Sequence, residues 1–153
     1  TSFLEAGCFS AITVMIQREV ARRICAAPGS SDYGAFSVFC QYYAETELLF
    51  DVPPECFLPA PKVTSAVVRL VPRKAPPQTL VDDKTFFRVV KAAFAQRRKT
   101  LLNSLSSSGG YSKDLLRSVL AECGLEETIR GERLGIDAFG ELAFRLQSNS
   151  KQS

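Results

Sequence analysis

The apolar positions in the first half of the chain predict strands that alternate with helices. Residues 11–16 form a continuous, partly β-branched apolar run, which is typical of a strand buried on both faces of a parallel sheet. Residues 47–52 and 64–71 predict two more strands. This indicates an α/β fold, but a sheet buried in this way needs more neighbouring strands. Since the chain also starts at Thr1 without a methionine, we expect the C-terminal part of a longer protein.

Helices are expected around these strands. Residues 2–6 read as the last turns of a helix that Gly7 ends. Residues 19–26 predict a helix that the following proline and glycine end, and residues 36–44 predict an aromatic-rich helix. Each helix lies next to a predicted strand, as α/β architecture requires.

A stiff, polar segment divides the chain at residues 72–78, which include three prolines. We expect the α/β part over residues 1–71 and a small all-helical domain over residues 79–147. Residues 148–153 form a polar tail.

The second half of the chain has helical periodicity. Five apolar side chains fall within an arc of about 60° at 100° per residue: Phe87, Val90, Phe94, Leu101 and Leu105. Asp82 or Asp83 can cap the N-terminus, and Gly109-Gly110 can end the helix. The pattern therefore predicts one long amphipathic helix.

Two shorter helices are predicted after it. Ser112 is the expected N-cap of a helix over residues 113–123, and Gly124-Leu125 suits a Schellman-type end. Asp137 is expected to cap a last helix over residues 138–146.

The net charge of +3 is unevenly distributed. Residues 84–105 carry six basic and no acidic side chains, and residues 114–141 carry seven acidic and three basic ones. On the predicted long helix, Arg97 lies on one flank of the apolar stripe, and an arc of roughly 100° on the other flank holds Lys84, Arg88, Lys91, Arg98 and Lys99.

This basic segment has two interpretations. It is either a solvated helix face whose long side chains cover apolar neighbours, or a surface that binds phosphate. Residues 96–100, Gln-Arg-Arg-Lys-Thr, favour the second, because they add hydrogen-bond donors suited to phosphate and base edges.

A second basic cluster, Arg18, Arg22 and Arg23, follows the first predicted strand. Ligands of open α/β sheets lie outside the carboxyl ends of the strands, so these arginines are candidates for the mouth of a site. A plain i,i+4 ion pair between Glu19 and Arg23 is an equal alternative.

Composition excludes several kinds of chemistry. The chain has no histidine, which rules out His-based triads, His-ligated metals and imidazole acid-base catalysis within it. The five cysteines contain no Cys-x-x-Cys pair, which favours reduced, intracellular thiols. No apolar run reaches the roughly 20 residues that span a bilayer, so we expect neither a metal nor a membrane partner.

Phe57 lies on a loop that Pro54, Pro59 and Pro61 stiffen. Each proline fixes φ and pushes the preceding residue toward extended conformations. A ring held in this way suits the stacking of a flat base, and simple core packing is the alternative.

Four sequence blocks follow one another along the chain: Met15-Ile16-Gln17-Arg18-Glu19-Val20-Ala21; Ser31-Asp32-Tyr33-Gly34 with Ser37-Val38 and Gln41-Tyr42-Tyr43; Phe57-x-Pro59-x-Pro61-Lys62-Val63 with Ser65-Ala66-Val67-Val68-Arg69-Leu70; and Ala93-Phe94-x-Gln96-Arg97-Arg98-Lys99-Thr100-Leu101 with Asn103-Ser104-Leu105. Together they resemble the bacterial small-subunit (16S) ribosomal RNA adenine dimethyltransferases, the kasugamycin-sensitivity family, over residues 15–146. The erythromycin-resistance methyltransferases are a more distant match, since they are not expected to carry the Gln-Arg-Arg-Lys-Thr block.

The resemblance implies the C-terminal part of a Rossmann-like methyltransferase domain, followed by a helical RNA-binding domain. It implies methyl transfer from S-adenosylmethionine to N6 of two adjacent adenosines near the 3′ end of small-subunit rRNA, as a step of ribosome biogenesis in the cytoplasm. The implied partner is the rRNA or a 30S assembly intermediate.

The resemblance also implies roles for individual residues. Phe57 matches a phenylalanine that stacks on the target base, on a loop that Pro59, Pro61 and Lys62 shape. The expected RNA-binding residues are Arg97, Arg98, Lys99, Lys91, Arg88, Arg18 and Arg22.

The sequence departs from the family in two motifs. It lacks Asn-Leu-Pro-Tyr, which in the family contacts the amine and supplies a second aromatic wall, and no Gly-x-Gly loop follows a strand. We therefore expect no catalytic residue and no main cofactor-binding loop in this chain, which by itself should be inactive. A noncatalytic RNA-binding or ribosome-assembly module is the main alternative, and a domain whose basic helix packs against an acidic partner is a third.

Overall fold

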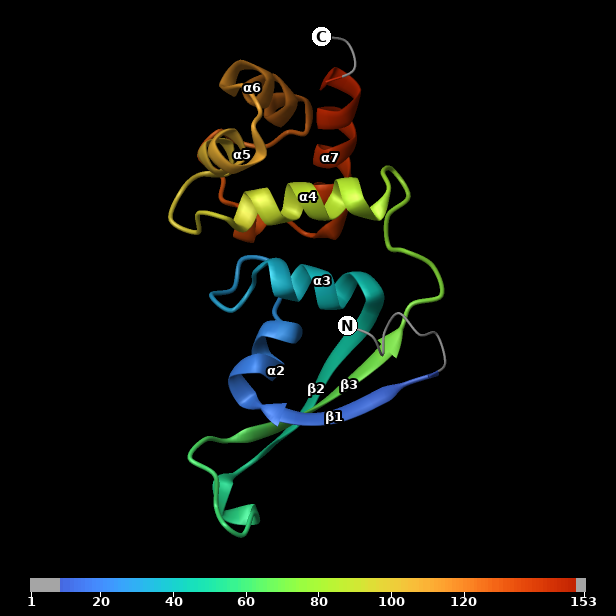
Figure 1. The fold of residues 1–153 in the computed structure, drawn as a ribbon, viewed down its shortest axis with the longest axis vertical. Helices are drawn as coiled ribbons and strands as arrows, with labels where there is room; N and C mark the ends of the chain where they lie inside the picture. Colours follow the sequence, from blue (N-terminus) through green and yellow to red (C-terminus); the bar gives the residue numbers. More distant parts are fainter. Residues whose placement is uncertain (1–8, 151–153) are drawn as a thin grey trace. The chain divides into compact units, whose positions relative to one another are not determined.

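A computed structural model describes residues 9–150. The chain divides into two compact units, which we call the sheet unit (residues 1–27 and 31–76) and the helical unit (residues 28–30 and 77–153). The expected helix over residues 2–6 lies outside the described residues. The sheet unit contains strands and helices, and the helical unit contains only helices among its described residues, so the fold is α/β (Figure 1).

The sheet unit is built from three strands in the order β1-β3-β2. Its elements are β1 (Ile12–Gln17), α2 (Arg18–Ile24), α3 (Ala35–Tyr43), β2 (Ala44–Val52), the 3-10 turn η1 (Pro54–Cys56) and β3 (Ser65–Pro72). The predicted strands and both helices after residue 9 are thus confirmed. Helices α2 and α3 contact the sheet from the same side (Figure 1).

The prediction of a parallel, doubly buried first strand was wrong. Strands β2 and β3 form a hairpin around η1 and therefore pair antiparallel, and β1 also pairs antiparallel with β3. Along β1, half-buried residues alternate with exposed ones, and Met15 is 52% exposed. The apolar run is continuous in sequence, yet in the described part of the chain only one face of β1 packs against helices.

The core of the sheet unit lies between the sheet and its two helices. The buried residues come from α2, α3 and the central strand: Ala21, Ile24, Cys40, Ala44, Ala66, Val68 and Leu70. Ile12, Val14 and Ile16 of β1 pack against this cluster. The core therefore holds β1 and the start of α2 in place, and with them the residues where strand passes into helix.

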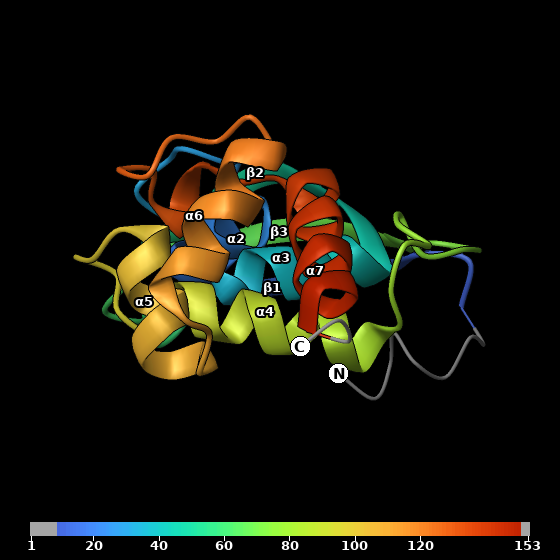
Figure 2. The same cartoon turned by 90° about the horizontal axis from the view of Figure 1, so that it is seen from above.

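The helical unit contains α4 (Asp83–Phe94), α5 (Leu101–Gly109), α6 (Lys113–Glu122), the 3-10 turn η2 (Gly131–Arg133) and α7 (Ile136–Ser150). Helix α4 packs against both α5 and α7, and α6 contacts the same two helices (Figure 2). Leucines fill this core, including Leu105, Leu116, Leu120 and Leu142, none of which is exposed.

The predicted long helix is two helices. Helix α4 ends at Phe94 and α5 begins at Leu101. The Ser104 side chain stabilises the break, because its Oγ donates to the Ala92 carbonyl (2.7 Å) and accepts from the Gln96 N–H (3.3 Å). Thr100 then caps α5 through a 3.3 Å bond from the Asn103 N–H. Apolar periodicity continued across the break because both helices bury a face in one core.

The predicted caps are confirmed with one exception. Asp82 accepts from the Thr85 N–H, and Ser112 accepts from the Leu115 N–H. Gly124 adopts φ +67°, and the Leu125 N–H donates to the Leu120 carbonyl (2.9 Å), which is the Schellman pattern. Asp137 is not a cap, since α7 begins one residue earlier, at Ile136. Its carboxylate in the first turn still complements the helix dipole.

Residues 28–30 belong to the helical unit although they follow α2 in sequence. The Gly29 N–H donates to the Glu132 carbonyl (2.7 Å), and Gly29 has φ +89°, a conformation that glycine adopts without strain. Residues 28–30, between α2 and α3 in sequence, therefore pack on η2.

Candidate nucleic-acid interface

Arg18, Arg22 and Lys62 line one hollow of about 390 Å³ on the sheet unit, which we call the β1 hollow. Helix α2 starts directly after β1, so Arg18 and Arg22 lie one turn apart at the carboxyl end of the strand. The backbone N–H of Arg18 donates to the Thr64 carbonyl (3.0 Å). This hydrogen bond joins the end of β1 to the loop that carries Lys62. The remaining lining residues are Gln17, Glu19, Asp32, Val63 and Thr64.

The two interpretations of the cluster formed by Arg18, Arg22 and Arg23 apply to different residues. Arg23 forms the i,i+4 ion pair with Glu19 and does not line the β1 hollow. Arg18 lies 3.5 Å from Asp51, with both side chains about 40% exposed. Within residues 9–150, Arg22 and Lys62 have no ion-pair partner. The β1 hollow thus offers Arg22 and Lys62 to an anionic ligand, with the carboxylate of Asp32 as the opposing charge in its lining.

Phe57 directly follows η1, and its N–H donates to the Pro54 carbonyl (3.1 Å). The ring is half-buried and belongs to neither the buried core nor the lining of the β1 hollow. Its neighbours Leu58, Pro59 and Pro61 are exposed, and the Leu58–Pro59 peptide bond is cis. An aromatic ring in this position is accessible to a ligand while its backbone is hydrogen-bonded.

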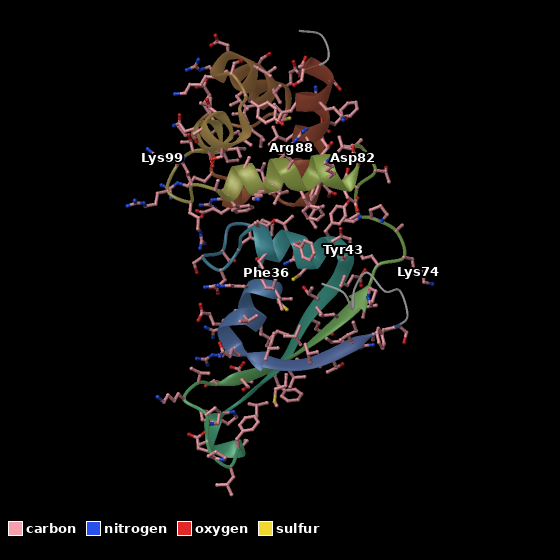
Figure 3. All side chains as sticks on the ribbon, viewed as in Figure 1. Phe36, Tyr43, Lys74, Asp82, Arg88 and Lys99 are labelled. Atoms are coloured by element: carbon pink, nitrogen blue, oxygen red, sulfur yellow. The ribbon has the colours of Figure 1, made fainter. Side chains whose placement is uncertain are left out.

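The basic loop, residues 96–99, connects α4 to α5 on the helical unit. All four of its side chains are exposed, and they line a hollow of about 350 Å³. Figure 3 shows Lys99 projecting beyond the end of α4. The predicted helical positions of Arg97, Arg98 and Lys99 were therefore wrong, because these residues lie on a loop. Lys84, Arg88 and Lys91 do lie on one helix, α4, and are exposed.

Hydrogen bonds hold the basic loop on both sides. The Lys99 N–H donates to the Gln96 carbonyl (2.9 Å) within the loop, and the Leu101 N–H donates to the Ile129 carbonyl (2.7 Å) after it. Together with the Ser104 bonds, these contacts fix the backbone while leaving the long side chains in solvent. Such a loop can present several cations to a polyanion with little ordering cost.

The described residues do not form a cradle for a nucleotide cofactor. The residues after β1, β2 and β3 are Arg18, Pro53 and Arg73, so no glycine-rich turn follows any described strand. Burial raises the pKa of the Cys25 thiol, and that of Cys40 to about 11, so both are protonated at neutral pH and are not nucleophiles.

None of the helices within residues 9–150 has the length and hydrophobicity needed to cross a bilayer.

Comparison with known proteins places these features in a family. The family described as "Ribosomal RNA adenine dimethylase" matches residues 2–130. The chain is 49% identical over 140 residues to the ribosomal RNA small subunit methyltransferase A of Desulfitobacterium hafniense, covering 92% of this chain and 50% of that protein. The chain is 47% identical over 135 residues to the protein of the same name from Caldanaerobacter subterraneus subsp. tengcongensis, covering 88% of this chain and 50% of that protein.

Solved structures agree on the fold. A dimethyladenosine transferase from Plasmodium falciparum aligns with a TM-score of 0.73 and 22% identity, covering 97% of this chain and 61% of that one. The 23S rRNA methyltransferase ErmE aligns with a TM-score of 0.63 and 25% identity, covering 94% of this chain and 57% of that one. This chain spans about half the length of the curated relatives it matches, and it belongs to the ribosomal RNA adenine dimethylase family.

Proposed function

We propose that this chain is the C-terminal, RNA-facing part of an rRNA adenine dimethyltransferase. The intact protein transfers methyl groups to N6 of two adjacent adenosines near the 3′ end of small-subunit rRNA, in the cytoplasm, on free rRNA or a 30S assembly intermediate. The observation that carries the proposal is the basic loop, in which Arg97, Arg98 and Lys99 are exposed on a backbone fixed by hydrogen bonds. The family membership supplies the reaction.

The proposed role of the cations is to hold the RNA backbone. Lys62 and Arg22 in the β1 hollow and the three basic side chains of the loop are solvent-exposed. Each phosphate contact releases counterions, which gives affinity that does not depend on sequence. Because phosphate contacts position without reading bases, recognition of the two adenosines must use other groups.

Phe57 is the proposed base contact. The exocyclic amine of adenine is a poor nucleophile, because its lone pair is delocalised into the ring, so the base must be extruded and held flat against the methyl donor. A half-buried ring on a loop stiffened by prolines can serve as one wall of that pocket. Stacking of this kind contributes on the order of 1–3 kcal/mol per base.

S-adenosylmethionine supplies the electrophilic methyl group in the proposed reaction. The described residues do not fit this cofactor, since no glycine-rich turn follows β1, β2 or β3. We therefore assign the cofactor site to a part of the intact protein that lies outside these residues. The same observation favours the second candidate function, a noncatalytic RNA-binding or ribosome-assembly module.

The test uses the complete protein that contains this chain. Its coding region is first read for Asn-Leu-Pro-Tyr and a Gly-x-Gly loop upstream of Thr1. The protein is then incubated with unmethylated small ribosomal subunits and S-adenosylmethionine carrying a labelled methyl group, and the RNA is digested and analysed by mass spectrometry. Two labelled dimethyladenosines support the proposal. Binding of the subunit with no label incorporated would contradict it and favour the noncatalytic module.

A further inference from the structure

A hollow of about 410 Å³ on the helical unit is separate from the basic loop. It is lined by Arg88 of α4, by Gly109, Gly110 and Tyr111 at the end of α5, and by Leu146, Gln147 and Ser150 of α7. We call it the Tyr111 hollow. Its volume falls within the range of small-molecule sites, about 300–1,000 Å³. Figure 3 shows Arg88 in the middle of α4, away from Lys99.

Two glycines position the Tyr111 ring. A Cβ on Gly109 would lie 2.8 Å from Cδ2 and 2.9 Å from Cε2 of Tyr111, so the ring edge rests directly against the Gly109 backbone. Gly110 ends α5 with φ +75°, which turns the chain so that Tyr111 comes back over the helix. The ring is half-buried. It is therefore held in place by the backbone and still reaches the hollow.

Three polar side chains that line this hollow, those of Arg88, Tyr111 and Gln147, have no partner within residues 9–150, whereas the Ser150 hydroxyl donates to the Leu146 carbonyl. Arg88 forms no ion pair there, and neither the Tyr111 hydroxyl nor the Gln147 amide forms a hydrogen bond. The other cations of the helical unit include Arg117 and Arg145, which each contact two carboxylates. The lining of this hollow thus combines an aromatic ring with residues that carry a guanidinium, a hydroxyl and an amide.

We propose that the Tyr111 hollow binds a single unpaired nucleotide of RNA. The base stacks on Tyr111, Gln147 hydrogen-bonds the base edge, and Arg88 binds the nucleotide's phosphate. A ring, a bidentate donor and an amide are the groups that single-stranded RNA recognition uses. The inference rests on the proposed RNA-binding function, but it concerns residues that the family resemblance did not single out, apart from Arg88.

The C-terminal end of α5 favours a base over an isolated phosphate in the adjoining part of the hollow. Gly109 is the last residue of α5, and the carbonyls at this helix end carry partial negative charge. These carbonyls disfavour an anion but accept hydrogen bonds from the exocyclic amine of adenine, guanine or cytosine. The phosphate then lies toward Arg88, the only cation lining the hollow among the described residues.

The first test uses mononucleotides, so that it does not depend on RNA binding elsewhere. Adenosine, guanosine, cytidine and uridine 5′-monophosphates and inorganic phosphate are each titrated into the 15N-labelled chain, and amide shifts are followed by NMR. We expect saturable shifts at Gly109, Gly110, Tyr111 and Gln147 with the nucleotides, strongest for bases that carry an exocyclic amine. Equal shifts with inorganic phosphate, or none at these amides, would overturn the proposal.

The second test uses variants and a fluorescent hexaribonucleotide in an anisotropy titration. Tyr111→Phe retains the ring and should keep the affinity within about threefold, whereas Tyr111→Ala should weaken it by about 5- to 150-fold, the equivalent of 1–3 kcal/mol of stacking. Arg88→Gln should also lower the salt slope by about 0.7. Arg117→Gln, which removes a paired cation, is the control. Circular dichroism verifies that each variant is folded.

The outcomes separate the two proposals. If Tyr111→Ala binds the hexanucleotide as well as the unsubstituted chain, the nucleotide site is excluded, and the RNA-binding function of the basic loop stands. If no RNA binds but the mononucleotides shift the hollow's amides, the site stands and the RNA-binding function fails. Loss of affinity in Tyr111→Phe as large as in Tyr111→Ala would assign the effect to the hydroxyl and contradict stacking.

Discussion

Phe57 and Ser104 differ in burial and therefore in what each side chain can contact. Phe57 is half-buried on an exposed loop, where its ring contributes little to the core. Ser104 is fully buried, and its hydroxyl satisfies backbone groups on both sides of the break between α4 and α5. The first residue is available to a ligand, and the second fixes a backbone on which other side chains reach a ligand.

Replacement of Phe57 by alanine in the complete protein should reduce turnover more than RNA affinity. Loss of base stacking corresponds to about 5- to 150-fold in kcat, while most phosphate contacts persist and should keep the affinity within about threefold. Steady-state methylation kinetics and RNA titration measure the two quantities. Leu58→Ala, at a fully exposed neighbour, is the control. Equal losses in both quantities would show that Phe57 serves folding or general binding.

Ser104→Ala should destabilise the helical unit by about 1–3 kcal/mol, because the Ala92 carbonyl and the Gln96 N–H lose their shared partner. A lower thermal unfolding midpoint should be seen by circular dichroism. Ser107→Ala is matched, since Ser107 is an exposed serine of the same helix, and it should change the stability by no more than about 0.5 kcal/mol. An unchanged midpoint for Ser104→Ala would mean that water replaces the hydroxyl.

At the scale of elements, the break between α4 and α5 places three basic side chains on an exposed loop. On a continuous helix, Arg97 would lie on the opposite flank of the apolar stripe from Arg98 and Lys99. On the basic loop, the three side chains are consecutive and exposed around one hollow. Breaking the helix therefore gathers charges that helical geometry would separate.

Alanine at Arg97, Arg98 and Lys99 together should flatten the salt dependence of RNA binding. If each side chain contacts one phosphate, the slope of log affinity against log salt falls by about 2–3 units. Fluorescence anisotropy at several salt concentrations measures it. The matched control removes three cations that are ion-paired in the structure, Arg23, Arg73 and Arg117, and should lower the slope by less than about one unit. Similar slopes for both triple variants would remove the basic loop from the interface.

At the scale of the whole molecule, the two units have different tasks in the proposed function. The sheet unit carries Phe57 and the β1 hollow, and the helical unit carries the basic loop and the Tyr111 hollow. Neither contains a glycine-rich turn after a strand within the described residues. The proposed function therefore assigns RNA binding to this chain and methyl-donor binding to residues outside its described part.

The chain alone should therefore bind RNA but not S-adenosylmethionine. Isothermal titration of the cofactor into this chain is expected to give no saturable heat at micromolar concentrations, whereas the complete protein should give a normal isotherm. Saturable micromolar binding to the chain would contradict the assignment of the cofactor site to other residues.

The sequence by itself determined most of the elements and several of their ends. Apolar runs and cap residues such as Asp82, Ser112 and Gly124 act through neighbours a few residues away, so their effects can be read locally. The four motif blocks similarly placed the chain in its family.

Only the tertiary structure decided the antiparallel sheet, the break at residues 95–100 and the hollows. Strand direction depends on pairing partners that are distant in sequence, as between Met15 and Val67. The break depends on Ser104, which reaches back to Ala92 across the turn. The Tyr111 hollow joins α4, α5 and α7. These features arise from contacts between segments that are far apart in the chain, and no local pattern of apolar and polar residues encodes which segments meet.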